Sequence, residues 1–401
     1  MSRHQRFLAA VALAAVGAAA ALAPTPASCE RIRFVFTGDS RSETPTVKPV
    51  KPIDLINTPV LGAIRDQILT LSPRPQFVVF GGDMAYRGDY DGQFTFATFK
   101  DFFAKPLADG GIKTYTTVGN HELYKHPSTG GFNIANQAEF QKTFTDNPSN
   151  GLPGHERLDY SFHSPGGEAL FAVLDAYYLT GDAPSAEDPE NDNGTITDPQ
   201  LAWLKSQIAA SGATHKFLFV HAPYYTVWHP PPAPYQDASY TKLWKVVDDN
   251  RFAMYFAGHV HLYSRKTVDA SVPPVPQLDP AVQWKNPVVQ AITGTAGAGA
   301  DSATPPADAS WHVSTGADNY YFTVVDIDGP VVTVTSYIGN TGAYKPFDSY
   351  VLGGNGPGAD AIPALSNPLL AACGALVLLS AWVALRRRTV RPPRRLKEND
   401  E

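Results

Sequence analysis

Short apolar runs alternate along the chain with longer segments in which apolar residues recur at helical spacing. Runs such as FVVF at 77–80 are rich in β-branched and aromatic residues and end in glycine, which is typical of buried strands. We expect strands at 31–37, 77–80, 112–118, 160–163, 169–175, 216–220, 252–257 and 288–293. We expect helices at 59–71, 93–108, 132–144, 198–208 and 240–247.

Two boundaries can be predicted more finely from turn and cap residues. NYYFTVVDI and PVVTVTSYI flank Asp328-Gly329, which predicts a β-hairpin with its turn at that pair. Asp198 followed by Pro199 predicts a helix that begins with Asp198 at its N-cap.

The two ends of the chain differ from its middle. Residues 1–28 have a basic start, an apolar run and small residues, the order found in secretory signal peptides. Cys29 also admits lipidation, although the proline three residues before it departs from that pattern. Residues 353–363 form a Gly/Pro linker, and 364–385 supply the roughly 20 apolar residues that span a bilayer.

The arginines of the tail, 386–401, indicate that this end stays in the cytoplasm. The apolar helix before it is then either a membrane anchor or a sorting signal that is cleaved after export. We therefore expect residues 29–352 to form an exported domain of the cell envelope, outside the cytoplasm and held to the membrane by the C-terminal helix.

Composition narrows the chemistry of this domain. The sequence is 43% hydrophobic and 17% charged, which suits a globular protein with a substantial core. The net charge is −6 and the sequence has no basic stripe, so it lacks the clustered positive charge with which proteins bind nucleic acid. The two cysteines, Cys29 and Cys373, belong to the terminal segments, so we expect no disulfide or thiolate metal site in the middle. Any metal ligands there must be oxygen and imidazole.

Side chains of that kind follow several predicted strands at their carboxyl ends, where α/β sheets place ligands. They are Asp39 in GDSR, Asp83 in GGD, Asn120 and His121 in GNHE, His221 in VHAP, and His259 and His261 in GHVH. Carboxylate, amide and imidazole donors suit hard or borderline transition metals. The two oxygens of Asp83 can bridge two ions about 3.5–4 Å apart, a clamp suited to in-line displacement at phosphorus.

The order and separation of GD, GGD, GNHE, a strand-borne histidine and GHVH resemble the calcineurin-like metallophosphoesterase superfamily over about residues 31–340. The resemblance implies a four-layer α/β/β/α sandwich of two mixed β-sheets flanked by helices. It implies a first metal ion bound by Asp39, Asp83 and His261. It implies a second ion bound by Asp83, Asn120, His221 and His259. His121 would protonate the leaving oxygen or stabilise the transition state.

Arg41 and Tyr86 distinguish this sequence within the superfamily. Most members have a metal-binding histidine at the position of Arg41, and arginine stays protonated and cannot coordinate a cation. Arg41 therefore either contacts the substrate phosphate or pairs with a carboxylate such as Asp89 or Glu122. Tyr86 matches the GDxxY motif of purple acid phosphatases, in which the tyrosine binds ferric iron; the alternative is a packing role.

Together these features predict an exported, acid phosphatase-like hydrolase with two metal ions, Fe(III) and a divalent Fe, Zn or Mn. It would cleave phosphorylated small molecules, as monoesters, by in-line attack of a metal-bound hydroxide. A phosphodiesterase or nucleotidase on the same site is the alternative. A non-catalytic surface protein that kept the fold would normally have lost some of these ligands, and here they are all present. A serine hydrolase is not supported either, because the sequence has no GxSxG motif. The oligomeric state stays open.

Overall fold

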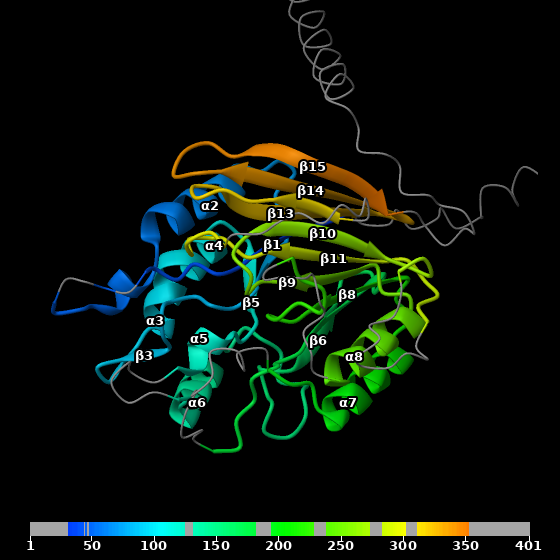
Figure 1. The fold of residues 1–401 in the computed structure, drawn as a ribbon, viewed down its shortest axis with the longest axis horizontal. Helices are drawn as coiled ribbons and strands as arrows, with labels where there is room; N and C mark the ends of the chain where they lie inside the picture. The colour runs from blue at the N-terminus through cyan, green and yellow to red at the C-terminus, as the bar shows by residue number, and fades with distance from the viewer. Residues whose placement is uncertain are drawn as a thin grey trace, which may run out of the picture.

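The computed structural model describes residues 31–43, 45, 48–124, 131–181, 194–227, 238–272, 283–301 and 311–352 (Figure 1). The predicted signal peptide, linker, C-terminal apolar helix and basic tail lie outside the described residues. Among the helices that the structure does describe, none combines the length and the apolar character needed to cross a membrane.

A six-stranded mixed sheet contains the first strand of the domain and its last three. Its order is β15-β14-β13-β1-β2-β5. β1, β2 and β5 run parallel, and β13 pairs with β1 in the antiparallel sense. The strands are β1 (Ile32–Thr37), β2 (Phe77–Phe80), β5 (Lys113–Thr116), β13 (Tyr320–Asp328), β14 (Val331–Gly339) and β15 (Lys345–Leu352).

A seven-stranded mixed sheet is built from the middle of the chain, in the order β12-β10-β11-β9-β8-β7-β6. β7, β8, β9 and β11 are parallel, with antiparallel strands outside them. The strands are β6 (Tyr160–His163), β7 (Ala169–Val173), β8 (His215–Phe219), β9 (Met254–Ala257), β10 (Tyr263–Val268), β11 (Val288–Thr293) and β12 (Trp311–Ser314). A short hairpin of β3 (Asp89–Tyr90) and β4 (Gln93–Phe94) lies apart from both sheets.

The two sheets pack face to face through an aromatic core. Alternate residues of a strand point to opposite faces, so Phe34 and Phe36 enter this core while Val35 packs on the helical side. The ring of Phe34 stacks on Phe77 of its own sheet at 5.2 Å and meets Phe171 of the other sheet edge-on at 5.3 Å. These buried apolar faces hold the sheets together.

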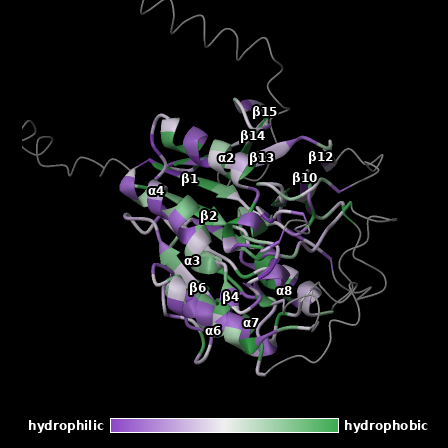
Figure 2. Cartoon of the chain, turned by 90° about the vertical axis from the view of Figure 1, so that its left-hand side faces the viewer, coloured by the Kyte–Doolittle hydropathy of each residue, from purple (hydrophilic) through white to green (hydrophobic). Residues whose placement is uncertain are grey.

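Helices cover the outer faces, with α2–α4 and α7–α8 on opposite sides of the strands in Figure 1. In Figure 2, β1 and β2 are largely hydrophobic, whereas α4 and α6 carry hydrophilic residues. The predicted α/β class with two mixed sheets is confirmed. The helices are η1 (Pro52–Leu55), α2 (Thr58–Thr70), α3 (Phe96–Phe99), η2 (Lys100–Ala104), α4 (Lys105–Asp109), α5 (Asn120–Leu123), α6 (Ile134–Thr143), α7 (Asp198–Ala210) and α8 (Ala238–Asp249).

The helix expected at 93–108 begins later and contains a π-helical turn. Its first expected residues form β4, and η2 separates α3 from α4. Pro106 has no N–H to donate to the carbonyl of Phe102, four residues earlier. That carbonyl instead accepts a hydrogen bond from Arg65 Nη1 at 2.8 Å. The wider turn therefore coincides with the position where the regular hydrogen-bond ladder is interrupted.

Two predicted boundaries were wrong by one residue. Thr197, not Asp198, is the N-cap of α7: the Thr197 hydroxyl accepts from Gln200 N at 3.3 Å, and Gln200 Oε1 accepts from Thr197 N at 2.8 Å. In the hairpin, Asp328 pairs with Val331, so the turn consists of Gly329 and Pro330. Gly329 has φ 55°, a left-handed conformation that suits glycine.

Candidate metal centre

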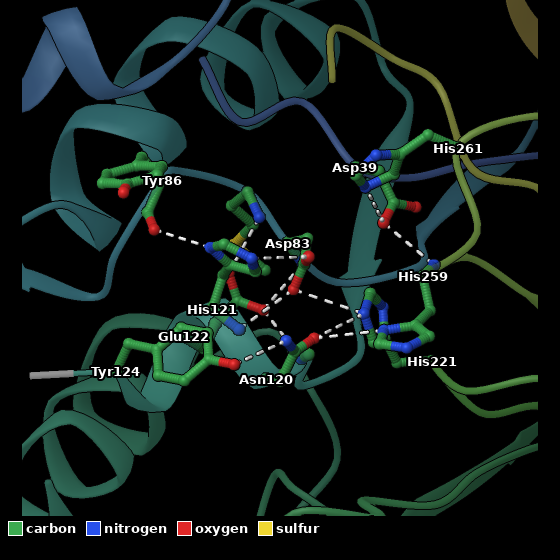
Figure 3. Close-up of polar contacts among 12 residues, drawn as sticks. Asp39, Asp83, Tyr86, Asn120, His121, Glu122, Tyr124, His221, His259 and His261 are labelled. Atoms are coloured by element: carbon green, nitrogen blue, oxygen red, sulfur yellow. Dashed lines mark hydrogen bonds and ion pairs between the residues drawn. The ribbon is translucent and has the colours of Figure 1, made fainter. Parts of the chain in front are cut away.

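The predicted ligands converge because each follows a parallel strand at its carboxyl end. Asp39 follows β1, Asp83 follows β2, and Asn120 lies beyond β5, all in the six-stranded sheet. His221 follows β8 and His259 follows β9 in the seven-stranded sheet. Figure 3 shows these side chains, with His121 and His261, pointing toward one another across the junction of the two sheets.

The potential ligand atoms lie within a few ångströms of each other. One ligand atom each from Asp39, Asp83 and His221 lie within 4.8 Å of one another. His221 Nε2 is 3.3 Å from Asp83 Oδ1 and 3.2 Å from Asn120 Oδ1. His259 Nδ1 is 3.3 Å from the same Asn120 oxygen.

His261 completes the group on the Asp39 side. Its Nε2 lies 3.8 Å from Asp39 Oδ1. The structure thus brings together every ligand that the resemblance implied for the two ions, with the exception of the Tyr86 ring described below.

The His221 ring is oriented by the backbone of the neighbouring sheet. Its Nδ1 lies 2.6 Å from the carbonyl oxygen of Gly81, and an Nδ1–H that donates to this carbonyl leaves the Nε2 lone pair facing the cluster. Burial lowers the pKa of His221 to about 4. The ring is therefore neutral near pH 7, which is the form that binds metal ions.

Asp39 and Asp83 are two buried carboxylates that face the same small volume. Burial, followed by the charge of Asp83, raises the pKa of Asp39 well above its usual range. Asp39 Oδ2 is buried and has no hydrogen-bond partner among the described residues. A bound cation would remove both costs, because it pairs with the buried charges. The donor set therefore fits metal ions that prefer oxygen and nitrogen ligands.

Three ligand residues adopt left-handed backbone conformations. Asp39, Asp83 and His259 have φ values of 62°, 54° and 69°. Such values are uncommon for residues other than glycine and concentrate at functional sites. These backbone conformations occur where the chain turns sharply at the strand ends, and the turns direct the three side chains into the cluster.

The glycines that precede the ligands leave space for ligand oxygens. A Cβ at Gly119 would overlap Asp83 Oδ1, and a Cβ at Gly258 would overlap Asp39 Oδ2. The glycines of GNHE and GHVH thus allow backbone from one strand end to pack directly against a carboxylate from another.

Backbone and side-chain contacts hold His121 beside the cluster. Its backbone N–H donates to Asp83 Oδ1 at 3.1 Å, and its Nδ1 lies 2.6 Å from the carbonyl oxygen of Tyr86. This contact fixes the ring with Nε2 toward the cluster, 3.8 Å from Asp83 Oδ2. Burial, and next the charge of Arg41, lower the pKa of His121 well below its usual range.

The Tyr86 ring is not among the grouped ligands. Its carbonyl contacts His121 Nδ1, its ring lies 5.9 Å from the His121 ring, and Figure 3 shows the phenol pointing away from Asp83 and Asp39. The guanidinium of Arg87 lies over the rings of Tyr86 and Tyr124, 5.2 and 5.0 Å from their centroids. This cation–π contact gives the ring a packing position, so the predicted ligand role is not supported by the observed arrangement.

Arg41 lies close enough to the cluster for its charge to act against the raised pKa of the Asp39 carboxyl. Its Nε is buried with no hydrogen-bond partner, and no ion pair joins it to Asp89 or Glu122 in the part of the chain that the structure describes. Its charge contributes to lowering the pKa values of His121 and His261. An ion pair of Arg41 with Asp89 or Glu122 is thus not observed among the described residues.

Glu122 has a positioning role that the sequence analysis missed. Its carboxylate accepts from the backbone N–H groups of Asp83 and Gly119 at 2.7 Å each and from that of Met84 at 2.8 Å. Burial and the nearby Asp83 raise its pKa to about 8. Glu122 therefore joins the loop after β2 to the loop after β5. The available signal was its place beside His121 in GNHE.

Oxygen and imidazole donors at the strand ends of two packed sheets define an α/β metalloprotein. A family model described as calcineurin-like phosphoesterase matches residues 32–263. Because the match covers more than half of the chain, the protein belongs to the calcineurin-like phosphoesterase family. This is a family of metal-dependent phosphoester hydrolases with binuclear centres, and the predicted resemblance is confirmed.

Several solved structures are similar to this chain at low sequence identity. A purple acid phosphatase from yellow lupin seeds is 17% identical with a TM-score of 0.54; the match covers 82% of this chain and 55% of the lupin chain. GAP50, the anchor in the inner membrane complex of Plasmodium, is 14% identical with a TM-score of 0.49, and 81% and 90% of the two chains are covered.

A 5′-nucleotidase from Candida albicans is 13% identical with a TM-score of 0.38, and the match covers 73% of this chain and 47% of the nucleotidase. No curated protein matches the sequence. This chain spans about half the length of the lupin phosphatase, and its likeness to that protein concerns the fold.

Proposed function

We propose that the protein hydrolyses phosphate monoesters of small molecules at a centre of two metal ions. The convergence of Asp39, Asp83 and His221, with ligand atoms within 4.8 Å of one another, carries this proposal. Asp39, Asp83 and His261 would hold one ion; Asp83, Asn120, His221 and His259 would hold the other. When bound, the ions would supply a Lewis acid that neutralises charge on the phosphoryl oxygens.

His121 would donate a proton to the leaving-group oxygen. Burial keeps its ring neutral in the substrate-free site, and an adjacent phosphate anion favours the protonated form. The Tyr86 carbonyl holds Nδ1, so the proton on Nε2 is the one directed at the substrate.

The reaction is tested with p-nitrophenyl phosphate and bis(p-nitrophenyl) phosphate on protein reconstituted with Fe, Zn or Mn. We expect faster turnover of the monoester and at least a hundredfold loss in Asp83→Asn, because the bridging carboxylate is gone. The control Asp109→Asn, which changes only an exposed pair with Lys105, should keep full activity. Faster diester turnover would reassign the substrate class, and no turnover with any ion would refute the proposal.

Arg41 would hold the phosphate through charge-assisted hydrogen bonds from its planar guanidinium. Loss of such a contact costs about 1.5–3 kcal/mol, so we expect Arg41→Ala to lower kcat/KM about 10–100-fold, mainly through KM. Arg31→Ala is the control, because Arg31 pairs with Asp326 and has a side chain that is 52% exposed. Equal KM values in the two variants would show that Arg41 does not contact the substrate phosphate.

The identity of the ions depends on Tyr86. A phenolate ligand would favour ferric iron with a divalent partner, whereas the other donors also suit two divalent ions. Metal analysis and a visible spectrum of wild type and Tyr86→Phe decide this. Iron with a charge-transfer band that the mutation abolishes would establish the ferric site; two divalent ions without colour would leave Tyr86 packed on Arg87.

The order of segments at the chain ends supports export to the cell envelope, with residues 364–385 as the membrane attachment. Fractionation of cells that produce the full chain, followed by protease treatment of intact cells, tests this. Activity in the membrane fraction that external protease removes is the expected result. Activity in the cytosolic fraction would contradict it.

A further inference from the structure

Asn120 is the one proposed ligand whose side chain has two chemically different ends. Its amide oxygen can bind a metal ion, whereas its NH₂ group cannot, although the two ends have nearly the same shape. Oδ1 lies 3.2 Å from His221 Nε2 and 3.3 Å from His259 Nδ1, on the side of the cluster. The amide must be held in this orientation for the second ion to have its full ligand set.

The opposite end of the amide meets Tyr124. Asn120 Nδ2 donates to the Tyr124 hydroxyl at 3.3 Å. In Figure 3 the amide lies between this hydroxyl on one side and His221 with His259 on the other. In this orientation the hydroxyl accepts from the NH₂ group and leaves the amide oxygen on the side of the cluster. A rotated amide would instead place its NH₂ group on two ring nitrogens that are to bind metal.

The Tyr124 ring is itself held in place. Phe132 stacks on it at 5.2 Å and 21°, and a backbone bridge joins the same two residues. His121 meets the ring edge-on at 5.0 Å, and the Arg87 guanidinium lies 5.0 Å from its centroid. Because these contacts fix the ring, the hydroxyl is presented at a defined point beside Asn120.

We propose that Tyr124 is a positioning residue that holds the Asn120 amide through its NH₂ group, with the amide oxygen toward the second metal ion. The inference rests on the proposed function, since it presumes that the cluster binds two ions. Residues behind a ligand that fix its orientation typically change metal affinity 10–100-fold when they are removed. The effect should be confined to the second ion, because Asn120 is not among the ligands of the first.

The test is calorimetric titration of metal-free protein with Zn²⁺, which reports affinity without turnover. Asn120→Ala identifies the binding step of the second ion. We expect Tyr124→Phe to weaken that step about tenfold and to leave the first unchanged. Tyr321→Phe is the matched control: it removes a hydroxyl that contacts Ser314 Oγ at 3.0 Å, and it should leave both steps unchanged.

A double-mutant cycle separates orientation from packing. In Asn120→Ala there is no amide to hold, so the further change Tyr124→Phe should alter Zn²⁺ binding less than twofold. A tenfold loss in that background too, or wild-type affinity in Tyr124→Phe alone, would overturn the inference. Wild-type protein that binds no Zn²⁺ would instead refute the proposed function.

Discussion

Gly119 shows why a glycine precedes Asn120 in the GNHE motif. Its φ is −105°, a value that any residue adopts, so its lack of a side chain is a matter of space. An added Cβ would overlap Asp83 Oδ1 and would lie 2.9 Å from His221 Cε1. A single methyl group at this position therefore displaces ligands from both sheets.

Gly119→Ala should lower kcat/KM about 100-fold, since displacements near 1 Å at reacting groups have effects of that size. The crowding should also destabilise the fold by about 1–3 kcal/mol in denaturant titration. Gly212→Ala is the control, because a Cβ there meets nothing within 4 Å. Full activity in Gly119→Ala would show that the Asp83 carboxylate tolerates displacement.

Residue types and spacing predicted the ligands, because each follows a strand whose apolar pattern is clear. They did not predict which neighbours hold the ligands. Glu122 acquires its role through contacts with the loop after β2, whereas the Tyr124 hydroxyl meets Asn120 four residues away, at the end of α5. Tyr86 is the opposite case, because its position in the sequence predicted a ligand role that the observed arrangement does not support. It has the spacing of a ligand motif, yet the adjacent Arg87 provides a competing partner for its ring.

At the scale of elements, the start of α7 distinguishes two cap residues. Thr197→Ala removes the N-cap hydroxyl and should destabilise the protein by about 1 kcal/mol in urea unfolding. Asp198→Ala removes only an exposed pair with Lys242, together with a charge near the helix start, and should cost less. A larger loss of stability in Asp198→Ala than in Thr197→Ala would identify Asp198 as the N-cap.

The strands that the sequence analysis missed carry polar residues that are satisfied only in the folded protein. In β10, Arg265 pairs with Asp348 of β15 at 2.8 Å, and Lys266 lies over the ring of Trp311 in β12 at 4.8 Å. These contacts allow charged residues to occupy a sheet where an apolar pattern would otherwise be expected. Hydrophobic periodicity, which found the central strands, has no signal for such pairs.

At the scale of the whole molecule, the metal centre joins the two sheets, because each contributes part of the ligand set. Bound ions should therefore stabilise the entire domain. At a hundredfold excess over Kd the gain is about 2.7 kcal/mol, or roughly 4 °C in Tm for a domain of this size. Chelation followed by Mn²⁺ addition in a thermal melt measures it. Asp83→Asn should show little of this rise, and an unchanged wild-type Tm would contradict the stabilising role.

The pairing of β1 with β13 has a consequence for biosynthesis. β1 leaves the ribosome first among the described strands, yet one of its two neighbours is made only near the end of the domain. Until then β1 has an open edge, and such distant pairings fold slowly. The nascent chain therefore carries an unfinished sheet through most of its synthesis and needs protection from aggregation until the last hairpin closes it.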